Sequence, residues 1–411
     1  MLGGAAAVGS LAFLTGLLTL LVLVDLPENP RRKLFEINAA LGTSIVMLSL
    51  GGVLVYQAGS ALGGVGSRAM RVPNWALIVP FALGMFPFLV SLGQHQVNNP
   101  ETLPWLFPFT NVLIVSIPSL VIALVAAQRY SLFNTFAWPV SWREWTSGII
   151  YGAIGATTVA GFINTVYLVG AGLFLINTVG DGDTGNLAAG LRDLPRGWGI
   201  AFDLSVLSVV APLNEEFWKG MLVALFFFRK GGAGRCFLWG VLAGAGFNIL
   251  ETFQNSIAIV NPSEVSQQQL SEDWWKFASA RAGTGALHSA ATGLAALGFY
   301  GLFRRQGRFL WGYPAGVLLH GLWNFLNFTL AGDAILSQAG PHSTLLDILS
   351  VLGLFGLFFV SVAILWEAPR RIRDGAPAHI YRMLGMAPRP EARETALAEG
   401  RYPAAPFIPP A

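Results

Sequence analysis

The chain has 411 residues, of which 54% are hydrophobic and only 11% are charged, against about 25% charged residues in an average soluble protein. This composition excludes an ordinary soluble protein and is typical of a polytopic membrane protein. The single cysteine, Cys236, excludes an internal disulfide and a thiolate metal cluster, and no basic patch with interleaved aromatic residues indicates nucleic-acid binding.

Apolar segments of the length that crosses a bilayer, about 20 residues, recur along the chain. We therefore expect an all-α fold, a polytopic transmembrane helix bundle of about ten spans. The first is interpreted as a span and not a signal peptide, because it lacks a basic leading region and an A-x-A site. The expected spans are residues 3–24, 36–57, 74–93, 109–127, 147–176, 200–228, 236–259, 278–303, 310–331 and 345–366.

We divide the chain into three regions. Residues 1–145 hold about four N-terminal spans of unknown role, and residues 146–366 hold about six spans with the polar motifs between 200 and 331. Residues 367–411 are rich in Pro, Ala and Arg and lack an apolar face, which predicts a mobile cytoplasmic tail.

Basic residues in the loops predict the orientation of the bundle. Arginines and lysines gather in the loops that would share a side with the tail, whereas loops 94–108 and 331–345 carry neither. Because positive charge favours the cytoplasmic side, we predict a multi-pass protein of the cell membrane with both termini in the cytoplasm. The basic segment 28–36 departs from the rule, since it would lie outside.

Ionisable side chains inside spans cost roughly 2.5–3.5 kcal/mol each on insertion scales, so each is a candidate for function. In this chain they concentrate in the sixth to ninth spans, together with polar amide and hydroxyl side chains. The candidates, in chain order, are Glu215, Glu216, Lys219, Asn248, Glu251, Arg281, His288, Thr292, His320 and Asn324.

The spacing of these residues predicts which of them share a helix face. Asn248 and Glu251 are three residues apart, and the pairs His288 with Thr292 and His320 with Asn324 are four apart, so each pair shares a face. The adjacent Glu215 and Glu216 point about 100° apart, and Lys219 can neutralise either carboxylate.

Their depth predicts a common level. At about 1.5 Å per residue from the nearest basic loop residue, they lie about 18–24 Å into the membrane, although successive helices run in opposite directions. We therefore expect one shared polar pocket just beyond the midplane. The residues that reach this level are Glu215, Glu251, His288, His320 and Asn324.

Two carboxylates, two imidazoles and a carboxamide form a general acid–base set. No serine or cysteine has a partner at the spacing that nucleophilic catalysis needs, so water activated by a glutamate and attacking a carbonyl fits best. No cofactor is expected, because HExxH and other compact ligand spacings are absent from the sequence. A divalent metal such as zinc stays an alternative, with Glu216, Glu251, His288 and His320 as its ligands.

Other interpretations stay open. The glutamates and Lys219 would also suit an ion pair that locks the bundle, and His and Asn side chains hold transmembrane helices together. Carboxylates and histidines make proton relays in transporters, although the paired broken helices of inverted repeats are not seen. A non-catalytic scaffold with the same fold is the third class.

At these residues the chain resembles the PrsW-type branch of the CAAX-protease and bacteriocin-processing superfamily of intramembrane glutamic proteases. The resemblance rests on an EExxK motif at 215–219, an FxxxE motif at 247–251, His288, and an HxxxN motif at 320–324. It covers residues 196–330, about a third of the chain. CAAX-processing members usually have histidine where Glu251 stands, which favours the PrsW-type branch.

The resemblance implies hydrolysis of peptide bonds in membrane-associated protein substrates. By it, Glu215 or Glu216 would activate water, and Glu251 with His288 would complete the water site. His320 and Asn324 would stabilise the oxyanion, and Lys219 would hold the glutamates in place. We expect Asn248, Arg281 and Thr292 to support the site. The expected partners are the substrate and the lipid bilayer, without nucleic acid, and the oligomeric state stays open.

Overall fold

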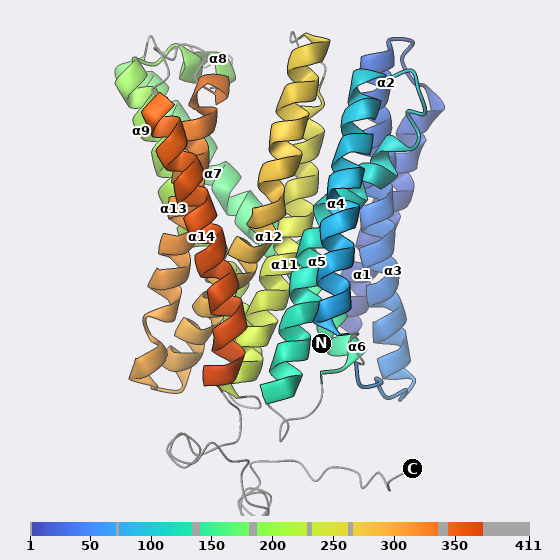
Figure 1. The fold of residues 1–411 in the computed structure, drawn as a ribbon, viewed down its shortest axis with the longest axis vertical. Helices are drawn as coiled ribbons and strands as arrows, with labels where there is room; N and C mark the ends of the chain where they lie inside the picture. The colour runs from blue at the N-terminus through green and yellow to red at the C-terminus, as the bar shows by residue number, and fades with distance from the viewer. Residues whose placement is uncertain are drawn as a thin grey trace, which may run out of the picture.

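The computed structural model of the chain describes residues 2–70, 74–133, 140–180, 187–227, 232–261, 266–335 and 344–372. These parts form a bundle of α-helices that contains no strand, which confirms the all-α prediction (Figure 1). Nine helical segments in these parts are long and apolar enough to cross a membrane. The protein is a multi-pass membrane protein.

The N-terminal elements are α1 (Leu2–Thr19), η1 (Leu20–Val24), α2 (Pro30–Ile37), η2 (Asn38–Gly42), α3 (Thr43–Leu62), α4 (Trp75–Asn98) and α5 (Phe107–Phe133). Next come α6 (Trp142–Ile150), η3 (Tyr151–Ala156), α7 (Thr157–Val179), α8 (Leu187–Arg192), α9 (Arg196–Leu204), η4 (Ser205–Val210) and α10 (Ala211–Phe227). The last are α11 (Ala233–Ile259), α12 (Gln267–Phe303), η5 (Gly307–Phe309), α13 (Gly312–Ile335) and α14 (Thr344–Arg371).

The ten expected spans correspond to nine apolar segments and α13. At 24 residues α13 is long enough to cross, but it is not among the nine apolar segments found in the described parts of the chain. Its His320, Asn324 and Asn327 make it more polar than its neighbours.

Several helices extend beyond the predicted apolar runs. The second segment is helical over Pro30–Leu62 and the fifth over Trp142–Val179, because capping starts each helix before its apolar part. The Asn29 side chain accepts hydrogen bonds from the backbone N–H groups of Arg31 and Arg32, and Ser141 caps α6 in the same way.

In the predicted tail, α14 continues to Arg371, and residues 373–411 lie outside the described residues.

Helices α11 and α12 form the centre of the bundle. Of their apolar stretches, 89% and 83% of the residues are buried, against 17–39% in the other apolar segments of the described chain. Helices in a bilayer associate by close packing of small side chains, and α11 meets α12 through glycines. A Cβ atom at Gly244 would collide with the carbonyl oxygen of His288, so only glycine permits this approach.

Three segments of the described chain are wound as π-helix: η2, η3 and η4. Segment η3 lies directly before α7, and η4 lies directly before α10, which carries the two adjacent glutamates. A π-helical turn inserts a residue into the helix and rotates the side chains that follow it, and such turns are frequent at functional sites.

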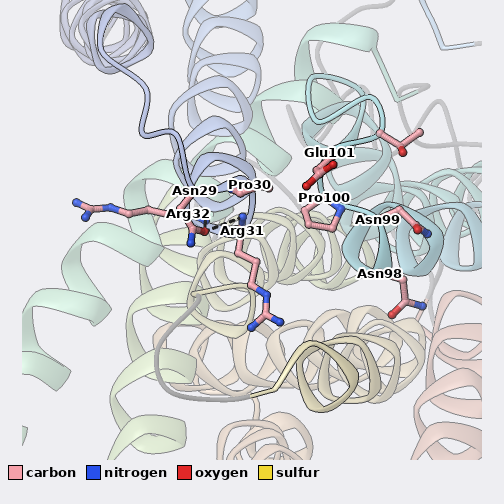
Figure 2. Close-up of a pocket in the computed structure, with 9 residues that line it drawn as sticks. Asn29, Pro30, Arg31, Arg32, Asn98, Asn99, Pro100 and Glu101 are labelled. Atoms are coloured by element: carbon pink, nitrogen blue, oxygen red, sulfur yellow. Dashed lines mark hydrogen bonds between the residues drawn. The ribbon is translucent and has the colours of Figure 1, made fainter.

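Helix α1 begins and α14 ends at the same end of the bundle (Figure 1). At the opposite end, a pocket of about 700 Å³ opens beside the start of α2 and the connection from α4 to α5. Figure 2 shows the side chains that line it, namely Asn29, Pro30, Arg31, Arg32, Asn98, Asn99, Pro100, Glu101 and Thr102. This pocket contains none of the polar candidates of the sixth to ninth spans.

Candidate active site

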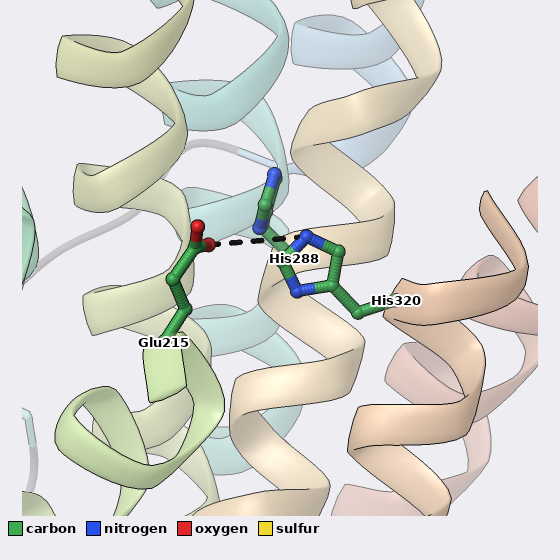
Figure 3. A group of neighbouring side chains, drawn as sticks. All are labelled: Glu215, His288 and His320. Carbon is green, nitrogen blue, oxygen red and sulfur yellow. Dashed lines mark ion pairs between the residues drawn. The ribbon is translucent and has the colours of Figure 1, made fainter. Parts of the chain in front are cut away.

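Four consecutive long helices, α10 to α13, bring most of the predicted polar residues together. Glu215, His288 and His320 point toward one another from α10, α12 and α13 (Figure 3). One ligand-type atom from each of the three lies within 4.8 Å of the others. The sequence-based expectation of a shared polar pocket therefore corresponds to a compact, buried cluster.

Within this cluster, Glu216 is completely enclosed. Its Oε1 atom lies 2.6 Å from the Lys219 ammonium and 2.9 Å from His320 Nδ1, and its Oε2 atom accepts a hydrogen bond of 2.8 Å from the Thr292 hydroxyl. A buried carboxylate is tolerated only when it is paired and hydrogen-bonded. Glu216 meets this condition, and both of its oxygens are engaged by protein groups.

Glu215 is bound more loosely. Its Oε1 atom accepts a hydrogen bond of 3.1 Å from Asn164 of α7. Its Oε2 atom lies 3.5 Å from Lys219 Nζ and 3.8 Å from His320 Nε2, the latter too long for a hydrogen bond. Glu215 therefore presents an oxygen with remaining acceptor capacity to the centre of the cluster.

His288 connects this cluster to Glu251. Its Nε2 atom lies 3.1 Å from Glu251 Oε2, and its Nδ1 atom lies 3.3 Å from Lys219 Nζ. Arg281 approaches the same Glu251 oxygen at 3.6 Å. The Glu251 side chain is 27% exposed, so this carboxylate is the cluster member nearest to the surroundings of the protein.

For neutral rings, the hydrogen-bond partners determine the proton positions on the two imidazoles. An ammonium group can only donate, so His288 Nδ1 accepts from Lys219 and its Nε2–H faces Glu251. Glu216, as a carboxylate, can only accept, so His320 donates from Nδ1 and keeps the lone pair of Nε2, which faces Glu215. We infer these tautomers from the partners.

The donor types of this cluster match those that bind a divalent cation. Two imidazoles and one carboxylate with an open fourth position are a known ligand set of catalytic zinc, and His320 already donates its other ring N–H to a carboxylate, as metal-bound histidines do. The three donors are Glu215, His288 and His320, a set that differs from the alternative based on Glu216 and Glu251. Lys219 opposes a cation here, because its ammonium group lies 3.3 Å from His288 Nδ1 and 3.5 Å from Glu215 Oε2. A cation would bind only after His288 gave up its hydrogen bond to Lys219.

Two predicted site residues face elsewhere. The Asn324 amide donates to the carbonyl oxygen of Leu207 in η4 at 2.9 Å, and the Asn248 amide donates to Ser119 of α5 at 2.8 Å. Asn248 and Glu251 therefore contact different neighbours, although they are three residues apart. The structure brings neither amide into hydrogen-bond contact with the cluster.

Two residues of the site were not assigned from the sequence. Asn164 bonds Glu215, and Phe247, which was noted only as a motif letter, places its ring 4.0 Å from the Lys219 ammonium. A lone amide in the apolar segment "GFINTVYLV" was the available signal for Asn164.

The fold and the cluster define a polytopic membrane protein with a buried carboxylate–imidazole site. Residues 142–364, more than half of the chain, match the sequence model of the PrsW family intramembrane metalloprotease. The chain belongs to this family, and it is an intramembrane protease by class. No curated protein and no solved structure matches the chain.

Proposed function

We propose that the protein hydrolyses peptide bonds of membrane-associated protein substrates with water that is activated by Glu215. The observation that carries this proposal is the difference between the two glutamates. Both oxygens of Glu216 are engaged by protein partners, whereas Glu215 Oε2 has acceptor capacity left and faces the lone pair of His320 Nε2. Of the pair, Glu215 is the better proton acceptor.

In this reaction Glu215 takes a proton from water while the water oxygen attacks the carbonyl carbon of the substrate. The proton then passes, directly or through His320 Nε2, to the amine that leaves as the carbon–nitrogen bond breaks. Once it carries that proton, His320 can also donate to the oxyanion. Glu216 and Lys219 hold His320 and Glu215 in place, and Glu251 fixes the His288 ring.

Asn324 has a positioning role in this proposal, because its amide donates to the backbone of η4. The bond to Leu207 connects α13 to the segment that leads into α10 and so helps to set the position of Glu215 relative to His320. This replaces the oxyanion role that the family resemblance implies.

If a divalent cation is resident, Glu215, His288 and His320 would hold it, with His288 Nδ1 released from Lys219. Bound there, it would acidify a coordinated water and polarise the substrate carbonyl. With Glu215 engaged in this way, Glu251 would be the carboxylate left to accept a proton, since it is partly exposed and contacts His288.

The test is cleavage of single-span reporter substrates by the purified protein in liposomes. Glu215→Gln is expected to lower kcat by about 10²–10⁴-fold, the range of general-base catalysis. Glu272→Gln is the matched control, because Glu272 lies exposed on α12 outside the cluster and its carboxylate accepts a hydrogen bond from Gln268. Glu215→Gln with wild-type cleavage would remove Glu215 from the mechanism.

Metal dependence needs its own measurement. Purified protein is analysed for bound metal and then assayed after treatment with a chelator. Stoichiometric metal together with activity that is lost on chelation and restored by zinc would support the ligand set above. Full activity in metal-free protein would leave water activation to Glu215 without a cation.

A further inference from the structure

Helix α7 reaches the site through one polar residue, Asn164. Around it, α7 exposes apolar side chains on several faces, among them Phe162, Val166 and Phe174. The Asn164 side chain instead turns toward α10, where its Nδ2 atom donates to Glu215 Oε1 at 3.1 Å. The carboxylate that we assign as the proton acceptor is therefore held from a helix outside the four that carry the motifs.

Asn214 fixes the orientation of the Asn164 amide. The Asn214 Nδ2 group donates to Asn164 Oδ1 at 2.7 Å and to the carbonyl oxygen of Ala160 at 2.9 Å. The Ala160 carbonyl oxygen can only accept, so Asn214 must turn its NH₂ group toward Ala160 and Asn164. Asn164 therefore faces Asn214 with its Oδ1 atom and faces Glu215 with its NH₂ group. The two asparagines thus form a directed relay that ends on Glu215 Oε1.

The relay determines which oxygen of Glu215 is available. With Oε1 bound to Asn164, the carboxylate cannot rotate about its last bond without losing that hydrogen bond, and Oε2 stays directed at the cluster. We propose that Asn164, oriented by Asn214, is a positioning residue that keeps the Oε2 atom of Glu215 in the reactive position. This inference rests on the proposed role of Glu215 in water activation.

A purely structural role for Asn164 makes a different prediction. If it only tethered α7 to α10, its removal would lower the melting temperature and leave kcat of the folded protein unchanged. A positioning role predicts lower kcat at nearly unchanged KM, because misplacing a catalytic group by a fraction of an ångström affects the transition state more than substrate binding.

The experiment compares Asn164→Leu with Asn177→Leu, using a single-span reporter that the wild type cleaves. Leucine has a similar volume and cannot donate. We expect Asn164→Leu to lower kcat about 10- to 100-fold with KM within threefold of wild type. Asn177, also on α7, bonds the backbone of its own helix at Leu173, so Asn177→Leu is expected to keep wild-type kcat.

Asn214→Leu is the second variant, and it tests the relay if Asn164→Leu does not fold. It leaves the Asn164 amide in place but frees its orientation, so we expect a smaller loss of kcat. Because both residues act through one relay, the double variant should lose no more than Asn164→Leu alone.

Three results separate the possible failures. Wild-type kcat in Asn164→Leu, or fully additive losses in the double variant, would overturn the relay. Glu215→Gln that still cleaves would overturn the proposed function itself. An inactive Glu215→Gln beside a fully active Asn164→Leu would overturn only the role of Asn164.

Discussion

Lys219 is fully buried, and its ammonium group lies within 3.5 Å of Glu215, Glu216 and His288. The Phe247 ring adds a contact on its remaining side. Removing one partner of a buried ion pair is costly, because the other charge is left without compensation. Lys219 therefore supplies the positive charge that compensates the adjacent carboxylates at this depth.

Lys219→Met is expected to destabilise the protein by about 3–5 kcal/mol, because two buried carboxylates lose their counter-ion. Thermal unfolding in detergent measures this loss. Glu216→Gln in the same chain removes one of the two uncompensated charges, so the double variant should recover part of the stability. A melting temperature for Lys219→Met equal to that of the wild type would contradict the ion pair.

Thr292→Val tests the hydrogen bond to Glu216 Oε2. The change leaves a buried carboxylate oxygen without its donor, which costs about 1–3 kcal/mol, and the looser Glu216 should also lower cleavage through His320. Thr284→Val is the matched control, since the Thr284 hydroxyl is buried on the same helix but bonds its own backbone at Ala280. Equal losses in the two variants would contradict a special role for Thr292.

At the scale of elements, the position of His288 depends on the close approach of α11 and α12. Gly244 of α11 faces the carbonyl oxygen of His288 so closely that a Cβ atom would collide with it. Two neighbouring segments, η3 and η4, are π-helical and lead into the helices that carry Asn164 and Glu215. Backbone packing and helix winding therefore set the geometry of the cluster.

Gly244→Ala is expected to push α12 away and to cost about 1–3 kcal/mol, as overpacking of a core does. Because His288 is at the point of contact, cleavage should fall as well. Gly161→Ala is the control, because a Cβ atom at Gly161 of α7 meets nothing within 4 Å. It should be neutral or stabilising by up to about 1 kcal/mol. Cleavage activity and melting temperature are measured for both variants. If Gly244→Ala behaved like Gly161→Ala in both measurements, the close approach at His288 would not be required.

At the scale of the whole molecule, the start of α1 and the end of α14 lie at the same end of the bundle (Figure 1). This agrees with an even number of crossings, while the side of the membrane on which they lie stays a prediction from the loop charges. Helix α4, with 24 residues, is about 36 Å long at 1.5 Å per residue. Residues before and after it therefore lie on opposite sides.

Labelling with a membrane-impermeant maleimide tests the orientation in a Cys236→Ala background. Thr102→Cys, in the exposed connection after α4, should be labelled in intact cells. Gly66→Cys, in the exposed connection before α4, should be labelled only after the membrane is made permeable. The reverse pattern would place the C-terminus outside and would contradict the positive-inside prediction.

The fold class and much of the candidate cluster could be predicted from the sequence. Apolar length predicts the spans, and helical rise places Glu215, Glu251, His288 and His320 at one depth. These predictions succeed because helices in a bilayer are nearly parallel and regular, so depth follows from residue number. The division of the chain at residue 145 and the roles of the site residues stay predictions.

Rotation about each helix axis and the choice of partners follow from the tertiary structure alone. Asn324 shares a helix face with His320 in sequence, yet its amide bonds the backbone of η4. Asn164 belongs to the fifth expected span, outside the four that carry the candidates, yet it bonds Glu215. Glu215 and Glu216 are adjacent in the sequence, and only the packing of α10 against α12 and α13 encloses Glu216 and leaves an oxygen of Glu215 available.

The sequence by itself determined the helices and the depth of their charges, since these depend on local hydropathy and rise per residue. The tertiary structure decided which atoms meet, because that depends on close packing between helices distant in the chain.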